Sequence, residues 1–186
     1  MNAAHLEVCA SPEWKAALRD DILPFALRDA QLGDDVLEVG SGPGMTTDLL
    51  REEVPKLTCC ELDEDLARSL AERLAGTNVE VVNADATDMP FEDGRFTGAV
   101  SFNMLHHVPT ADLQDRLLAD VARVLRPGAV FVACDGLPNP DLEAFHEGDT
   151  YNPLELGDVA PRLEEAGFRD VEVRSNEYGW AAQARR

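Results

Sequence analysis

Cysteine is scarce in this sequence, and its few occurrences exclude two kinds of site. Only four of the 186 residues are cysteines, at positions 9, 59, 60 and 134. Their spacing matches neither zinc ligands nor a disulfide framework, so we expect buried free thiols in a reducing compartment. Cys59 and Cys60 are adjacent, so their side chains would point to opposite faces of a strand. The sequence therefore predicts no metal site.

Basic residues are also few. Sixteen Lys and Arg residues against 36 Asp and Glu residues give a formal net charge of −20 at pH 7. A negative field of this size repels phosphate backbones, whose binding depends on lysine and arginine contacts. We therefore expect neither a nucleic acid nor an anionic membrane as a partner. A high net negative charge is typical of proteins that it keeps soluble. The alternative explanation of the charge is a cationic substrate or partner.

Long apolar runs are missing as well. No run approaches the roughly 20 residues that a helix needs to cross a bilayer, and the first residues lack the pattern of a secretory signal. A length of 186 residues suits one domain with a well-buried core. We expect a soluble, cytoplasmic protein with one domain over residues 1–186. Within it, 1–32 is expected to be a helical segment and 136–157 a short lid or insertion.

Patterns typical of strands and helices alternate along the rest of the chain. Strands are expected at 35–39, 56–61, 79–83, 96–102, 129–135, 170–174 and 179–184, and helices at 45–53, 64–75, 111–125 and before Gly167. Strands that alternate with helices form a mostly parallel sheet covered on both faces. The last two strands are too close for a parallel crossover, so they should pair as a hairpin. The predicted fold class is α/β, a Rossmann-like doubly wound seven-stranded sheet, mostly parallel with an antiparallel C-terminal edge hairpin.

The N-terminal segment has its own helix signals. Ser11 is a suitable N-cap and Pro12 suits the first helical position, so a helix is expected from Ser11 to Leu32. Pro24 lacks a backbone N–H and would clash with the preceding turn. We therefore expect Pro24 to divide this helix into two pieces.

The most informative stretch is the glycine loop, which reads GSGPG at 40–44 and joins the strand at 35–39 to a helix. Ligands of open α/β sheets bind at the carboxyl ends of strands, and glycines let a ligand approach the main chain closely. The dinucleotide-binding fingerprint needs a glycine at the sixth position of the loop, which here is Met45. Pro43 also removes a donor for a pyrophosphate. The carboxylate of Glu38, just upstream of the loop, suits a cationic ligand better than a pyrophosphate.

The glycine loop resembles motif I of the class I S-adenosylmethionine-dependent methyltransferases, and the resemblance extends along nearly the whole chain. The further motifs that carry it, in order, are CELD at 60–63, NADATDMPF at 83–91, FTGAVSFN and LHHV at 96–108, RVLRPG at 123–128 and LEEAGF at 163–168. Within the class, the sequence is similar to the small-molecule group often called type 11.

The resemblance implies a site for S-adenosyl-L-methionine, with S-adenosyl-L-homocysteine as the product. Glu61 would bind both ribose hydroxyls, and Asp85 would accept from the adenine amino group. The methionine ammonium would lie against backbone carbonyls, and apolar side chains would flank the adenine ring. The full set implied for the cofactor is Glu38, Gly40, Ser41, Gly42, Gly44, Glu61, Leu62, Asp85, Ala86 and Asn103.

Methyl transfer from a sulfonium is an in-line displacement that depends mainly on positioning. A base is needed only when the acceptor must lose a proton first. His106, His107 and Tyr151 are the candidates for catalysis, with Asp135 and His146 in the same expected acceptor region. The alternative for the two adjacent histidines is local packing or capping.

Two other functions stay open besides a methyltransferase with a small-molecule acceptor. One is a non-catalytic, methyltransferase-like binding or partner subunit, and the other is a nicotinamide-dependent oxidoreductase. The missing sixth glycine and the closing hairpin count against the oxidoreductase. Because the expected lid is short, a homodimer in which the second subunit completes the pocket also stays open.

Overall fold

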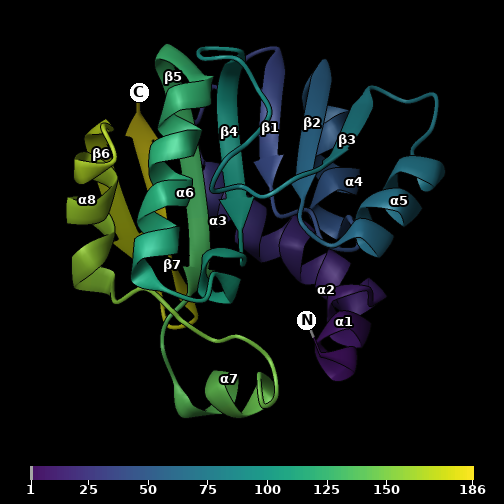
Figure 1. The fold of residues 1–186 in the computed structure, drawn as a ribbon. Helices are drawn as coiled ribbons and strands as arrows, with labels where there is room; N and C mark the ends of the chain where they lie inside the picture. Colours follow the sequence, from purple (N-terminus) through teal and green to yellow (C-terminus); the bar gives the residue numbers. More distant parts are fainter. Residues whose placement is uncertain (1) are drawn as a thin grey trace.

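A seven-stranded sheet forms the centre of the molecule (Figure 1). The computed structural model describes residues 2–186, so Met1, with which the predicted domain begins, lies outside it. The strands are β1 (Asp35–Val39), β2 (Lys56–Glu61), β3 (Val79–Asn83), β4 (Phe96–Phe102), β5 (Leu125–Gly136), β6 (Arg169–Ser175) and β7 (Gly179–Arg185). Their order is β3-β2-β1-β4-β5-β7-β6, and β7 is antiparallel to both of its neighbours. The predicted fold class is confirmed.

Helices cover both faces of the sheet. They are α1 (Ala3–Cys9), α2 (Pro12–Ala17), α3 (Leu23–Leu27), α4 (Met45–Glu53), α5 (Glu64–Arg73), α6 (Ala111–Val124), α7 (Pro140–Phe145) and α8 (Leu156–Glu165). Apolar residues of α6 and α8 pack on one face, which is the near face in Figure 1. Residues of α3, α4 and α5 pack on the other face. No described helix is long and apolar enough to span a bilayer.

Alternation along the strands assigns neighbouring residues to the two cores. Leu37 and Cys60 belong to the core under α6 and α8, whereas Val36 and Cys59 belong to the core under α3, α4 and α5. Cys59 and Cys60 therefore point to opposite faces, as their adjacency in a strand predicts. All four cysteines are free, and Cys9 is the one that is only partly buried.

Pro24 does not divide the N-terminal helix, contrary to the prediction. A π-helical turn (Leu18–Ile22) joins α2 to α3, and the N–H of Leu23 donates to the carbonyl of Leu18. The wider turn adds one residue just ahead of Pro24, where the missing N–H and the bulky ring would otherwise disrupt the helix. Ser11 caps the start as predicted, with its hydroxyl accepting from the N–H of Trp14. The helix ends at Leu27 rather than at Leu32.

The short helix α7 was missing from the sequence prediction, and α1 lies within the predicted helical segment 1–32 but ahead of the helix expected from Ser11. The side chain of Asn2 caps α1 by accepting from the N–H of His5, and that of Asn139 caps α7 by accepting from Leu142. An asparagine at the cap, followed at α7 by Pro140 in the first turn, is the sequence signal that was overlooked. In Figure 1 these helices lie beyond the end of the sheet at which β1 and β4 finish.

The end of α3 is fixed on the C-terminal hairpin by side chains of the two last strands. The guanidinium of Arg174 donates to the carbonyls of Phe25 and Ala26, and the amide of Gln183 donates to those of Ala26 and Leu27. These donors satisfy carbonyls that the end of a helix leaves unpaired.

We expect Gln183→Ala to lower the free energy of unfolding by about 1 kcal/mol, because it removes two hydrogen bonds between β7 and the end of α3. The carbonyl of Ala26 keeps the donor Arg174, and that of Leu27 keeps the N–H of Ala30. Urea unfolding of the wild type and the variant measures this difference. Gln31→Ala is the matched control, since Gln31 is exposed and donates only one long bond, to the carbonyl of Asp29. An equal loss in the two variants would contradict the role of Gln183 in fixing α3.

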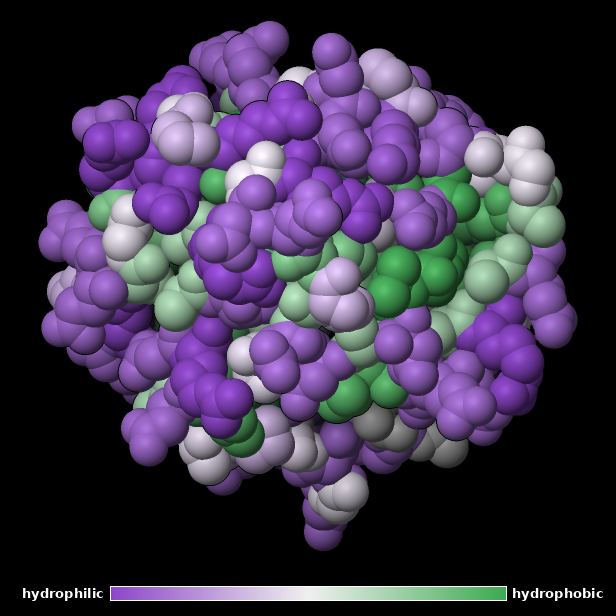
Figure 2. Space-filling model, turned by 45° about the horizontal axis from the view of Figure 1, so that its top comes forward, coloured by the Kyte–Doolittle hydropathy of each residue, from purple (hydrophilic) through white to green (hydrophobic). Residues whose placement is uncertain are grey.

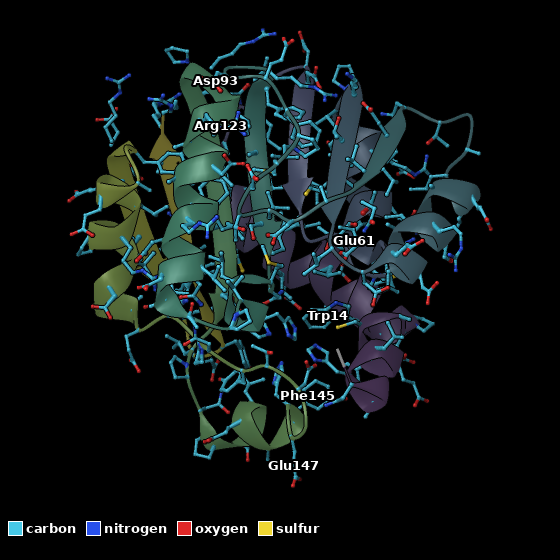
Figure 3. All side chains as sticks on the ribbon, in the orientation of Figure 1. Trp14, Glu61, Asp93, Arg123, Phe145 and Glu147 are labelled. Carbon is cyan, nitrogen blue, oxygen red and sulfur yellow. The ribbon has the colours of Figure 1, made fainter. Side chains whose placement is uncertain are left out.

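The surface agrees with the charge of the chain. Figure 2 shows a mostly hydrophilic face on the side where the parallel strands begin, with its largest hydrophobic area right of the centre and smaller ones at the left and bottom. Figure 3 shows Arg123 and Asp93 at that end of the sheet, where Nη1 of the arginine lies 2.8 Å from Oδ1 of the aspartate. The candidate site lies at the opposite end.

Candidate functional site

Two adjoining cavities lie at the carboxyl ends of the central strands. The loop cavity has a volume of about 530 Å³ and lies against the glycine loop. The lid cavity, of about 1030 Å³, lies between α1–α3 and the segment from Asp135 to Tyr151. The residues that line both are His5, Cys9, Trp14 and Asn103. In Figure 3, Trp14 and Glu61 lie on the loop-cavity side and Phe145 on the side of α7.

The glycine loop can be built only from glycine at two of its positions. Gly40 and Gly44 have φ angles of 75° and 86°, in the left-handed region. A Cβ on Gly40 would lie 2.1 Å from Cγ of Met104, and one on Gly44 would lie 2.3 Å from Cδ1 of Leu70. Gly40 lets the loop approach the turn after β4, whereas Gly44 lets α4 start against α5.

Glu61 ends β2 and is bonded to the loop. Its Oε2 accepts from the N–H of Gly42 at 2.7 Å, and its Oε1 accepts from the N–H of Asp63 at 2.9 Å. The side chain is largely buried, with 8% of the residue exposed. Each carboxylate oxygen keeps a further acceptor position, so the group can bind two donors that enter the loop cavity.

Glu38 lies beneath the loop and does not line either cavity. Its Oε2 accepts from the hydroxyl of Thr47 at 2.6 Å and lies 3.3 Å from Sγ of Cys59. Burial raises the pKa of Glu38 to about 7, since no cation compensates the ionised form there. The residue therefore acts on the loop through α4 rather than by direct contact with a ligand in the cavity.

The wall of the loop cavity after β2 and β3 is partly apolar. Leu62 lines the cavity although 69% of it is exposed, and Ala86 packs from the next strand connection. Asp85 lines the same wall, and its Oδ1 accepts from the N–H of Thr87 at 2.8 Å. An exposed leucine beside an alanine and a carboxylate suits a flat ring that carries an amino group.

Asn103 stands where the two cavities meet. Its φ of 49° is in the left-handed region, and its N–H donates to the carbonyl of Cys134 at 2.8 Å. Its side-chain Nδ2 is buried and has no hydrogen-bond partner. A strained backbone and an unpaired buried donor are typical of residues that meet a ligand.

The histidines lie between the cavities. His106 is held by Asp135, whose Oδ1 lies 2.5 Å from Nδ1 of the ring and whose Oδ2 accepts from the His106 N–H at 3.1 Å. His107 packs on His106 with ring centroids 4.2 Å apart. Burial, together with the neighbouring imidazoles, lowers the pKa of His107 to about 3 and that of His5 to about 4. Both rings are therefore neutral at pH 7.

Tyr151 joins the same cluster from the lid. Its ring stacks on His146 with centroids 4.7 Å apart, and its hydroxyl oxygen is buried. Burial raises the pKa of Tyr151, which disfavours the phenolate at neutral pH. The three residues predicted for catalysis thus come together, with His107 on the loop cavity and His106 and Tyr151 on the lid cavity.

Most of the residues implied for a cofactor share one cavity. Eight of the ten line the loop cavity: Gly40, Ser41, Gly42, Glu61, Leu62, Asp85, Ala86 and Asn103. Glu38 and Gly44 do not line it, because one lies beneath the loop and the other packs α4 on α5. The sequence analysis missed the contribution of α1 and α2, from which His5, Cys9 and Trp14 reach the cavity.

The order of the strands explains why the cavity lies here. The sheet runs outward from β1 through β2 and β3 in one direction and from β4 through β5 in the other. The crevice where the order reverses is the usual ligand site of doubly wound sheets. Fold and site together define an α/β domain that binds a ligand at its glycine loop. The family model described as a methyltransferase domain matches residues 36–128, and the chain belongs to this family.

Similar proteins include enzymes with small-molecule substrates in their names. The chain is 32% identical over 154 residues to the O-methyltransferase rstn1 of Aspergillus nomiae, with 75% of this chain and 66% of that protein covered. It is 32% identical over 153 residues to the demethylmenaquinone methyltransferase of Clavibacter sepedonicus, with 81% and 56% covered. The chain thus spans between about half and two thirds of these relatives' lengths.

A solved structure covers the whole fold. The crystal structure of an S-adenosylmethionine-dependent methyltransferase from Aquifex aeolicus superposes with a TM-score of 0.76 over 99% of this chain and 98% of that chain. At 19% identity, this likeness shows the fold alone.

Proposed function

We propose that the chain is an S-adenosyl-L-methionine-dependent methyltransferase that acts on a small-molecule acceptor. The observation that carries the proposal is the carboxylate of Glu61, fixed in the loop cavity by the N–H groups of Gly42 and Asp63. The two acceptor positions of a carboxylate that is fixed in this way suit the paired hydroxyls of a ribose. Membership of the methyltransferase domain family supports the same assignment.

The residues present fit the cofactor in two further respects. The close contact between Gly40 and Met104 leaves no space for a side chain at the point where the methionine part would meet the loop. The unpaired Nδ2 of Asn103 could donate a hydrogen bond to the carboxylate of the cofactor's methionine part. Asp85, Leu62 and Ala86 supply an acceptor and an apolar wall for the adenine ring.

The acceptor would occupy the lid cavity and meet the cofactor beside Asn103, which lines both cavities. When bound, the cofactor supplies a methyl group on a positively charged sulfur. Transfer of that group to the acceptor would be an in-line displacement, in which the residues that line the two cavities would supply the positioning. The name of the demethylmenaquinone methyltransferase relative favours a small organic acceptor, and that of the O-methyltransferase relative favours transfer to oxygen.

A base is needed only for an acceptor that loses a proton. Of the three candidates, His106 is the one whose ring a buried carboxylate orients, since Asp135 accepts from its Nδ1–H. The neutral His107 and the un-ionised Tyr151 lack such a partner for proton transfer. We therefore assign proton acceptance, where the acceptor requires it, to Nε2 of His106.

The experiment that tests the proposal is calorimetric titration of the purified chain. We expect S-adenosyl-L-methionine and S-adenosyl-L-homocysteine to bind with micromolar dissociation constants and NADH not to bind. Binding of NADH alone would replace the proposal with a nicotinamide-dependent oxidoreductase. No binding of any of the three would replace it with a non-catalytic partner subunit. Confirmed cofactor binding then justifies a screen of small organic acceptors with labelled methyl groups.

A further inference from the structure

All four histidines of the chain meet at one place, although they come from three separate parts of the sequence. His5 comes from α1, His106 and His107 from the 3-10 turn after β4, and His146 from the end of α7. One ring nitrogen from each lies within 4.8 Å of the others. No sequence spacing predicts such a group, which is why the sequence analysis expected no metal site.

The hydrogen bonds fix which nitrogen of two rings carries the proton. Nδ1 of His146 lies 2.6 Å from the carbonyl oxygen of Leu142, and a carbonyl only accepts, so this nitrogen donates. Nδ1 of His106 lies 2.5 Å from Oδ1 of Asp135, which also accepts from the N–H of Gly136. In the neutral rings Nε2 of both histidines is then a bare acceptor.

These acceptors have nothing to bind among the described residues. Nε2 of His106 and Nε2 of His146 are buried without a hydrogen-bond partner, and so is Nδ1 of His5, which lies 3.8 Å from Oδ2 of Asp149. Burying a hydrogen-bond acceptor without a donor costs free energy, and neighbouring lone pairs also repel one another. A cation between them would satisfy all of them at once.

We propose that His5, His106, His107 and His146 bind one divalent transition-metal ion of the zinc type. Imidazole nitrogens suit zinc, and four of them complete a tetrahedral site. Histidine ligands of metals usually donate their second N–H to a carboxylate or a backbone carbonyl, and His106 and His146 do so here. A tetrahedral zinc site has nitrogens about 3.4 Å apart, so the four side chains would draw together on binding.

An ion at this place would connect three separate parts of the chain. His5 belongs to the N-terminal helices and His146 to the segment 136–157. The other two histidines belong to the 3-10 turn that follows the central strand β4. The ion would thus hold α1 and α7 over the two cavities as a structural cross-link. It would also occupy Nε2 of His106, so the loaded protein would not use that nitrogen as a base.

The test uses the chain without a polyhistidine tag, since such a tag binds the same ions. After treatment with a chelator, the protein is titrated with cobalt(II) and then zinc(II). We expect one ion per chain, the visible absorption of four-coordinate cobalt, its loss when zinc is added, and a zinc dissociation constant below about 1 μM. X-ray absorption of the zinc-loaded wild type should give nitrogen neighbours only, at about 2.0–2.1 Å.

The zinc affinity of single-residue variants tests which side chains bind the ion. His146→Ala and His5→Ala should each weaken zinc binding at least about 100-fold, and Asp135→Asn about 10- to 100-fold through His106. Cys9→Ser is the matched control, because Cys9 lines the same two cavities and should leave zinc affinity unchanged. Circular dichroism and urea unfolding report whether each variant is folded. Zinc should also slow proteolysis within 136–157.

Several outcomes would overturn the proposal: no stoichiometric metal binding, sulfur neighbours in the absorption spectrum, or zinc affinity that survives both histidine substitutions. Equal proteolysis with and without zinc would overturn the cross-linking role. The metal titration does not depend on the proposed function, since it needs neither the cofactor nor an acceptor. A chain that binds zinc but not S-adenosyl-L-homocysteine would refute the methyltransferase proposal alone.

Discussion

Replacement of Glu61 by alanine is expected to weaken S-adenosyl-L-methionine binding by about 1.5–3 kcal/mol, or roughly 10- to 150-fold. The variant loses a carboxylate that would accept from two ribose hydroxyls. It also leaves the N–H groups of Gly42 and Asp63 without their acceptors, which are 2.7 and 2.9 Å away in the wild type. Both changes act on the same wall of the loop cavity, so their effects on affinity have the same sign.

Titration calorimetry of the folded variant measures this loss, and two controls separate its causes. Glu64→Ala removes the same charge from an exposed site three residues further on, so it tests the long-range effect of charge on a cationic ligand. Asp85→Ala should lower the affinity for S-adenosyl-L-methionine less than Glu61→Ala does, because the adenine amino group can donate partly to water instead. Unchanged affinity in Glu61→Ala would contradict the binding of the ribose by Glu61. Equal losses of affinity in Glu61→Ala and Asp85→Ala would contradict the assignment of the ribose to Glu61 and of the adenine amino group to Asp85.

The parts of this site that the sequence predicts are those fixed by neighbours along the chain. Strands at 35–39, 56–61, 79–83 and 96–102 have the expected bounds. Those at 35–39, 56–61 and 96–102 are mostly buried runs, as is typical of central parallel strands, whereas 79–83 is a partly exposed strand at the edge of the sheet. Residues directly after such strands must lie at the carboxyl edge of the sheet. Glu61 and Asn103 were therefore predictable as lining residues.

The parts that the sequence does not predict depend on how distant elements dock. The π-helical turn before Pro24 keeps α2 and α3 in one continuous helix, which directs α1 and α2 over the loop cavity. The cluster of histidines depends on that docking and on α7, a six-residue helix in the segment 136–157 that was expected to be a short lid or insertion. Local patterns contain no information about either contact. The role of Glu38 was misjudged for a related reason, because its partner Thr47 lies on the next helix.

Glu38 is expected to make the protein less stable as the pH rises, by about 3 kcal/mol in total. Its pKa is about 7 in the folded protein and 4.5 in the reference state. Between these values the folded chain keeps a proton that the unfolded chain has released, so stability falls with increasing pH. The contribution is fully present below about pH 4.5 and lost above about pH 7. Glu38→Gln carries no such proton, and its amide oxygen can still accept from the hydroxyl of Thr47.

The measurement is urea unfolding of the wild type and Glu38→Gln at several pH values between 4 and 9. The expected result is that the free energy of unfolding of the variant, minus that of the wild type, increases by about 3 kcal/mol across this range. Glu53→Gln is the matched control, since Glu53 is exposed at the end of α4 and should give a constant difference. A constant difference for Glu38→Gln as well would mean that the buried carboxyl is ionised throughout. A cation or polar group must then reach it through the glycine loop, and Glu38 would regain the direct role toward a cationic ligand that the sequence analysis assigned to it.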